Sequence, residues 1–75
     1  MLTGYERQDP LTRPITIRER EVVRLVRQGL GNRSIAKQMG VREGTIKVHL
    51  HSIFRKTGVA NRTQLALRAA ELIGD

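Results

Sequence analysis

Apolar residues in the second half of the chain recur at helical spacing. After Glu43 the apolar positions follow i, i+4, i+7 and i+8, which places them on one face of a helix and the polar residues on the other. Gly58 can end this helix in a left-handed conformation, with Val59 placed for the apolar contact of a Schellman closure. The pattern predicts a helix over about residues 43–57, whose buried face is formed by Ile46, Leu50, Ile53 and Phe54.

A shorter helix is predicted immediately before this one. Asn32 can accept hydrogen bonds from the unpaired N–H groups of a first turn, and Gly40 can close the helix at little steric cost. Val41 can then pack into the corner between the two helices. The apolar residues of the shorter helix share one face, which comprises Ile35, Ala36 and Met39.

This pair of helices has the features of a helix-turn-helix. Ala36 is small where the helices would cross, and Gly40 permits a turn shorter than an ordinary loop. A second helix of about 15 residues is roughly 22 Å long and ~10–12 Å across, which suits the major groove of B-DNA. The alternative is the solvated face of a small helical bundle. The outward face would carry Gly44, Thr45, Lys47, Val48, His51, Ser52 and Arg55.

An earlier helix is predicted to begin at a capping box. Thr16 and Glu19 have the T-x-x-E spacing in which the hydroxyl and the carboxylate each satisfy a terminal N–H group. Capping and ion pairing explain Glu19 and Glu21 better than catalysis does, because nothing nearby completes an acid–base pair. The inner face would comprise Val22, Val23, Leu25 and Val26.

A fourth helix is predicted to start at Asn61, with Gln64 completing a second capping box. Its inner face would comprise Leu65, Ala69, Leu72 and Ile73. A second line lies nearly opposite and comprises Thr63, Leu67 and Ala70. Spacing leaves two interpretations of this second line open: a stray exposed leucine, or a helix-to-helix contact between two copies of the chain.

The charge of the chain favours a polyanionic partner. Its 75 residues include 14 Lys and Arg, of which 11 are Arg, against 7 Asp and Glu, for a formal net charge of +7. The planar guanidinium of Arg can donate two hydrogen bonds to one phosphate. Residues 32–58 alone contain six basic residues and one acid, so the excess lies where the DNA reader is predicted.

Residues 1–14 contain two prolines and no apolar period, which predicts a disordered or extended linker before a helical domain over residues 15–75. They could belong to a linker from an upstream domain. They could instead form a basic arm that enters the minor groove through Arg7 and Arg13. We favour the linker, because only two arginines stand among interspersed acids.

Several classes of protein are disfavoured. Without cysteine the chain can form no disulfide and no thiolate metal site. It has no apolar run of about 20 residues and no signal peptide, so we expect an intracellular, cytoplasmic protein without a membrane span. Paired carboxylates and a glycine-rich phosphate loop are missing, so no enzyme and no cofactor are expected.

The two histidines are predicted to have different roles. His49 and His51 are two positions apart on a helix, point in different directions and cannot bind one metal ion. We expect His49 to be packed and hydrogen-bonded near the buried face, and His51 to face outward.

The segment from Ile15 to Ala70 closely resembles the LuxR-type helix-turn-helix domain that ends the regulators of the NarL/FixJ response-regulator family. The most specific parts of the likeness are TIRERE at 16–21, G-L-x-N at 29–32, I-A at 35–36, T-I-K-V-H at 45–49 and N-R-T after G-V within 58–63. The resemblance implies an all-α, four-helix domain of a bacterial transcription regulator. It further implies that the third helix enters the major groove and that the fourth pairs two copies on inverted half-sites.

The resemblance also implies roles for individual residues. Base-edge contacts would fall at Gly44, Lys47, Val48 and His51. Phosphate contacts would come from Asn32, Arg33, Thr45, Ser52 and Arg55. The second line of the fourth helix (Thr63, Leu67 and Ala70) becomes the expected dimer contact.

The chain departs from the family pattern at four positions. Arg42 replaces a capping Ser or Thr, so either it contacts phosphate or the recognition helix begins with a frayed turn. Gly44 replaces a long polar side chain, which removes one possible base contact. Gly31 replaces Ser or Thr, and Thr57 replaces Leu, which should loosen the core slightly.

An alternative function is a protein-interaction module that docks on RNA polymerase or a partner regulator, with DNA contact incidental. Its affinity for duplex DNA would depend only weakly on salt, whereas phosphate contacts make affinity fall steeply.

Overall fold

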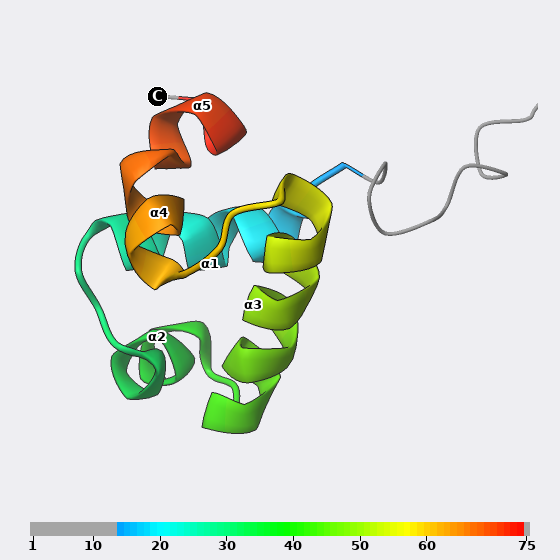
Figure 1. The fold of residues 1–75 in the computed structure, drawn as a ribbon. Helices are drawn as coiled ribbons and strands as arrows, with labels where there is room; N and C mark the ends of the chain where they lie inside the picture. Colours follow the sequence, from blue (N-terminus) through cyan, green and yellow to red (C-terminus); the bar gives the residue numbers. More distant parts are fainter. Residues whose placement is uncertain (1–13, 75) are drawn as a thin grey trace, which may run out of the picture.

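The computed structural model describes residues 14–74 (Figure 1). Within that range the chain forms α-helices and no strand, which confirms the predicted all-α class. Apart from Pro14, the predicted linker or arm, including Arg7 and Arg13, lies outside the described residues. The helices are α1 (Ile17–Arg27), α2 (Asn32–Met39), α3 (Glu43–Thr57), α4 (Arg62–Leu67) and α5 (Ala69–Ile73).

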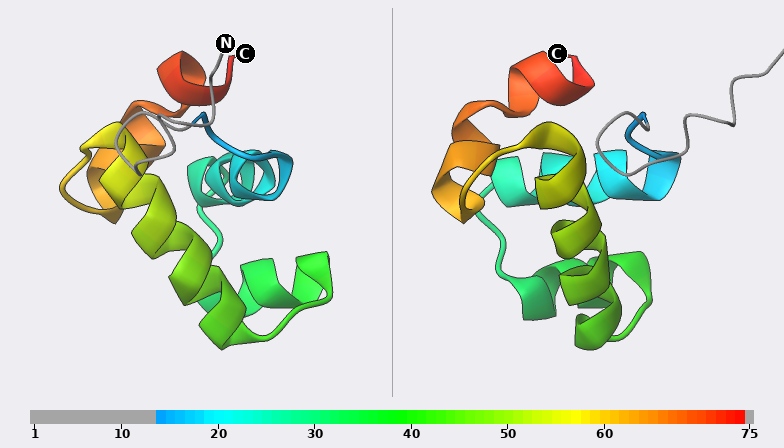
Figure 2. Two further views of the ribbon diagram at one scale, coloured as in Figure 1. Left: turned by 90° about the vertical axis from the view of Figure 1, so that its right-hand side faces the viewer. Right: turned by 45° about the vertical axis from the view of Figure 1, so that its right-hand side comes forward.

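Helix α1 lies at the centre of the arrangement. Figure 1 shows α2 and the start of α3 on one side of it and α5 on the other, while α4 overlaps α1 in this view and packs against it, and the end of α3 reaches the beginning of α1. The two views in Figure 2 agree that α2 and α3 diverge from a shared corner, with α1 beside the upper part of α3. The first half of α3 therefore extends beyond α1.

The start of α1 follows from its sequence. Thr16 Oγ1 accepts from the N–H group of Glu19 (3.1 Å), and Glu19 Oε1 accepts from the N–H group of Thr16 (2.9 Å). Both halves of the predicted capping box are therefore present.

The corner between α2 and α3 depends on a left-handed glycine. Gly40 has φ 71°, a conformation that costs an L-residue energy and glycine almost none. Its N–H group donates to the Lys37 carbonyl (3.3 Å), and the Val41 N–H group donates to the Ala36 carbonyl (3.0 Å). These two bonds form a Schellman motif, so the chain turns within the three residues that separate the helices.

The prediction of a Schellman closure at the end of α3 is wrong. Gly58 is left-handed as expected, but its N–H group donates to the Phe54 carbonyl (2.9 Å) in the simpler single-bond motif. The Val59 N–H group instead donates to Thr57 Oγ1 (3.3 Å), and that hydroxyl donates to the Ile53 carbonyl (2.8 Å). The threonine that was expected only to loosen the core therefore adds hydrogen bonds at the end of the helix.

The core is aliphatic and comes from every helix. The predicted buried faces are confirmed, although Phe54, Met39, Leu72 and Ile73 are only partly buried and pack against its edge. The fully buried large side chains are Val22, Val23, Ile35, Ile46, Ile53 and Leu65.

The predicted fourth helix is divided in two. Arg68 has φ −98° and ψ 6°, outside the helical region, and separates α4 from α5. No glycine or proline stands between Arg62 and Ile73, so the sequence contained no signal for this break. Beyond it, Arg20 Nη1 donates to the Ile73 carbonyl (2.6 Å), which holds the end of α5 against α1.

The start of α4 also differs from the prediction. Asn61 caps the helix by accepting from the N–H group of Gln64 (2.9 Å). The side chain of Gln64, however, accepts from the N–H group of Ala60 (2.9 Å) instead of returning to Asn61, so the capping box is only half formed.

Candidate nucleic-acid interface

The face of α3 turned away from the core carries most of the predicted DNA contacts. The opposite side of α3 is buried and comprises Ile46, Leu50 and Ile53. Their burial fixes the rotation of the helix about its own axis. The residues on the other side are exposed and comprise Gly44, Thr45, Lys47, Val48, His51 and Arg55. The Val48 side chain is 68% exposed, although valine is usually buried.

The first turn of α3 is regular in spite of Arg42. Arg42 makes no side-chain cap, but its carbonyl accepts from the N–H groups of Thr45 (3.0 Å) and Ile46 (3.4 Å). The first turn of α3 is therefore hydrogen-bonded and not frayed. The exposed Arg42 guanidinium remains a predicted phosphate contact.

The second half of α3 is fastened to α1 by a buried carboxylate. Glu19 is 4% exposed, and its side chain accepts from Lys56 Nζ (2.7 Å) and from Ser52 Oγ (2.7 Å). Lys56 Nζ also donates to the Pro14 carbonyl (3.2 Å). We call Glu19, Ser52 and Lys56 the Glu19 cluster. It joins residues more than 30 positions apart and fixes the end of α3 against the start of α1.

The Glu19 cluster also sets the charge state of its carboxylate. Burial raises the pKa of Glu19, but hydrogen bonds from Lys56, the Thr16 backbone and Ser52, together with the Lys56 charge, outweigh burial and lower the pKa from 4.5 to about 2. Glu19 is therefore ionised at neutral pH and compensates the charge of Lys56.

Ser52 was predicted to contact phosphate, and the structure gives its hydroxyl another partner. Ser52 is half-buried, and its hydroxyl donates a hydrogen bond to Glu19 Oε2. A phosphate oxygen only accepts hydrogen bonds, so Ser52 must release Glu19 before it can donate to DNA. The phosphate contact of Ser52 stays a prediction with that condition attached.

Asn32 was predicted to cap α2 with its side chain, and this prediction is wrong. Gly31 occupies the cap position, and Asn32 is the first residue of the helix. Its Oδ1 accepts from Arg62 Nη1 (2.6 Å). Arg33, the next predicted phosphate contact, is exposed.

Lys56 and Arg62 are the polar residues that sequence reasoning missed. Each is a cation with partners 30 or more positions away, so no local pattern revealed its role. For Glu19 the prediction of capping and ion pairing is confirmed, although the sequence did not identify Lys56 as its partner.

The histidines lie partly as expected. His51 is exposed and His49 is half-buried, but the His49 side chain makes no hydrogen bond to any residue between 14 and 74, contrary to the prediction. In the same range no group of three or more His, Asp or Glu side chains is placed to hold a metal ion.

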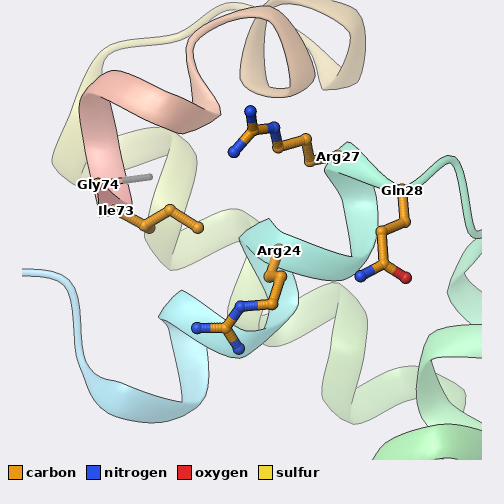
Figure 3. Close-up of a pocket in the computed structure, with 5 residues that line it drawn as sticks. All are labelled: Arg24, Arg27, Gln28, Ile73 and Gly74. Carbon is orange, nitrogen blue, oxygen red and sulfur yellow. The ribbon is translucent and has the colours of Figure 1, made fainter.

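An open cavity of about 640 Å³ lies apart from the predicted DNA contacts, between the end of α1 and α5 (Figure 3). Its walls come from the end of α1 and from α5, and none of its residues was predicted to bind DNA. The lining residues are Arg24, Arg27, Gln28, Ile73 and Gly74.

Among the described helices, none is long and apolar enough to cross a membrane.

The short helix α2, the tight turn at the left-handed Gly40 and the exposed basic helix α3 follow one another, and α1, α4 and α5 complete the domain. This arrangement defines a helix-turn-helix domain.

The comparison with known families agrees with this class. Residues 13–69 match the GerE family, described as bacterial regulatory proteins of the luxR family. The match covers most of the chain, so the chain belongs to the luxR family. Membership implies a part in DNA-binding transcriptional regulation.

Relatives of the chain are named as regulators. It is 44% identical over 63 residues to the monoamine regulon transcriptional regulator of Klebsiella aerogenes, across 84% of this chain and 28% of the relative. It is 42% identical over 50 residues to the probable csgAB operon transcriptional regulatory protein of Salmonella typhimurium, across 67% and 23%. It is 41% identical over 59 residues to the two-component response regulator PprB of Pseudomonas aeruginosa, across 79% and 22%. The matched region thus spans less than a third of each of these three proteins.

Proposed function

We propose that this chain binds double-stranded DNA sequence-specifically, with α3 in the major groove, as part of a bacterial transcription regulator that works in the cytoplasm. The observation that carries the proposal is the exposed first half of α3, where Lys47 and Val48 extend beyond the body of the domain. A single helix that extends beyond the rest of the domain can enter the major groove of DNA.

The chemistry of the predicted base contacts supports this proposal. Lys47 can donate to guanine O6 and N7, and His51 can donate or accept. Val48 can contact a thymine methyl group, which would remove its exposed apolar surface from water. Gly44 brings no side chain, but it lets a base edge approach the backbone.

Phosphate contacts would position α3 in the groove. Arg33, Arg42, Thr45 and Arg55 are exposed donors on α2 and α3, and Asn32 begins α2. Such contacts carry no sequence information themselves, but they fix the register of the helix on the duplex.

We further propose that two copies bind inverted half-sites through α4 and α5. Leu67 is 79% exposed, and Thr63 and Ala70 are exposed beside it, across the break at Arg68. Leu67→Asp should abolish paired half-site binding and leave the circular dichroism spectrum intact. Unchanged binding to a palindromic site would reject the dimer.

The whole regulator would include a further region that receives the signal. The matched region spans 28% or less of the three relatives described, one of which is named a two-component response regulator. A phosphorylated receiver domain on the same polypeptide is the regulation we propose.

The test of sequence-specific binding is selection of bound duplexes from a random library, followed by titration at two salt concentrations. A log–log slope of about −0.9 per phosphate contact is expected. Lys47→Ala and His51→Ala should reduce discrimination between selected and random duplex, whereas Arg55→Ala should weaken both about equally. Equal losses on both duplexes for all three variants would refute the division of roles.

The same titration distinguishes the alternative. A module that docks on RNA polymerase or a partner regulator would bind duplex weakly, with a shallow salt slope and no selected sequence. That result would overturn the proposal of DNA binding.

A further inference from the structure

Arg62 connects the start of α4 to the start of α2. Its Nη1 donates to Asn32 Oδ1 (2.6 Å), and its Nη2 donates to the Leu30 carbonyl (2.5 Å). The guanidinium is half-buried, and its two partners lie 30 and 32 positions earlier in the chain. Its position is therefore set by two bonds from one planar group, which leaves it little freedom to rotate.

This contact determines which way the Asn32 amide points. A guanidinium only donates hydrogen bonds, so the Asn32 atom that faces Arg62 must be the oxygen. The amide nitrogen then faces away from Arg62 with two N–H donors. Among residues 14–74 these donors have no side-chain or backbone acceptor.

We propose that Arg62 is a positioning residue for DNA binding, which acts by orienting Asn32 so that its amide donates to a backbone phosphate. The inference rests on the proposed function. Phosphate oxygens only accept, so the opposite orientation of the amide would present an oxygen to an oxygen and repel the phosphate. Arg62 thus selects the one amide orientation that fits DNA, without itself contacting the duplex.

Asn32→Asp separates this role from a structural one. Aspartate keeps an acceptor facing Arg62, and the bond becomes charge-assisted, so the melting temperature should be unchanged or higher. The outward donors are lost, so affinity for a mixed-sequence duplex a few helical turns long should fall about tenfold or more, the size expected for a hydrogen bond to a charged group.

The control for the added negative charge is Gln28→Glu, the same amide-to-carboxylate change at an exposed residue of the loop after α1. If Asn32→Asp binds duplex as well as Gln28→Glu does, the proposal is overturned.

A double-mutant cycle then tests whether Arg62 acts through Asn32. Arg62→Met should weaken duplex binding in the parent chain but not in the Asn32→Ala background, where no amide is left to orient. The salt slope should stay nearly the same in Asn32→Ala, because a neutral amide neutralises no phosphate charge, and it should also stay nearly the same in the double variant. A slope that becomes shallower by about 0.9 when Arg62 is replaced in the Asn32→Ala background would show that Arg62 contacts phosphate directly, which overturns the proposal.

Failure of this inference is distinguishable from failure of the proposed function. A parent chain without salt-dependent duplex binding refutes DNA binding itself. A parent chain that binds, with an Asn32→Asp variant that binds equally well, refutes only the role of Arg62. If Arg62→Met does not fold, Asn32→Asp and Gln28→Glu still decide the outcome.

Discussion

The two halves of α3 have the same helical backbone and opposite surroundings. The second half is fastened to α1 through Ser52 and Lys56, both bonded to the buried Glu19. The first half meets α2 along its buried face and leaves Lys47 and Val48 exposed. One helix can therefore be held rigidly by its end while its beginning stays free for a ligand.

The difference between the two halves of α3 gives a reason for the polar Glu19 cluster in so small a core. An aliphatic contact would hold α3 but would leave its rotation and sliding less restricted. Three directed hydrogen bonds to one carboxylate permit only one placement. We infer that the Glu19 cluster sets the direction in which the exposed first half of α3 points.

Lys56→Met should cause the largest loss of stability. It leaves Glu19 ionised and buried without its cation, a change that costs about 3–5 kcal/mol and removes most of the stability of a domain this small. Unfolding in urea, followed by circular dichroism, measures it. The matched control is Arg68→Met, which removes an ion pair whose side chains are 44% and 72% exposed and should cost under about 1 kcal/mol. Equal losses would show that the cluster is not an anchor.

Acid should weaken the contacts within the Glu19 cluster. The folded pKa of Glu19, about 2, lies below its ordinary value of 4.5, so the ionised carboxylate stabilises the fold above pH 4.5, and this contribution is lost as the pH falls toward 2. The shift corresponds to about 3 kcal/mol. Urea midpoints measured across this range should fall less in Glu19→Gln than in the parent chain. A Glu19 carboxyl NMR signal that titrates near 4.5 would contradict the prediction.

Val48→Ala tests the free half of α3. The side chain touches little of the fold, so the free energy of unfolding should change by less than about 0.5 kcal/mol. Affinity for a selected duplex should fall by about 1 kcal/mol, because two methyl groups no longer leave water on binding. Unfolding in urea measures the change in stability, and isothermal titration with selected and random duplexes measures the change in affinity. A large loss of stability would mean that the first half is not independent of the core.

Gly44→Ala should produce the smallest effect, and a favourable one. A Cβ at Gly44 would meet no atom within 4 Å, and alanine favours the helix by about 0.5–1 kcal/mol. The melting temperature should rise by a few degrees. Gly40→Ala is the opposite control, since φ 71° is strained for alanine and should lower the melting temperature. Equal signs for the two variants would contradict the assigned backbone roles.

Features that depend only on near neighbours could be predicted from the sequence. The capping box at Thr16, the left-handed turn at Gly40 and the apolar face of α3 all involve residues within about two turns of helix, where spacing decides geometry. From these features followed the all-α class, the helix-turn-helix and the exposed face that carries the predicted base contacts.

Packing between distant helices set the partners of Glu19, Asn32 and Arg62 and the break at Arg68, and no local pattern predicted them. These contacts join residues some 30 or more positions apart, and a side chain that can donate or accept in several directions takes the partner that packing brings to it. For the same reason a helix without glycine or proline could still divide where α5 turns toward α1. Local chemistry selects the elements, and the packing of distant elements selects which polar groups meet.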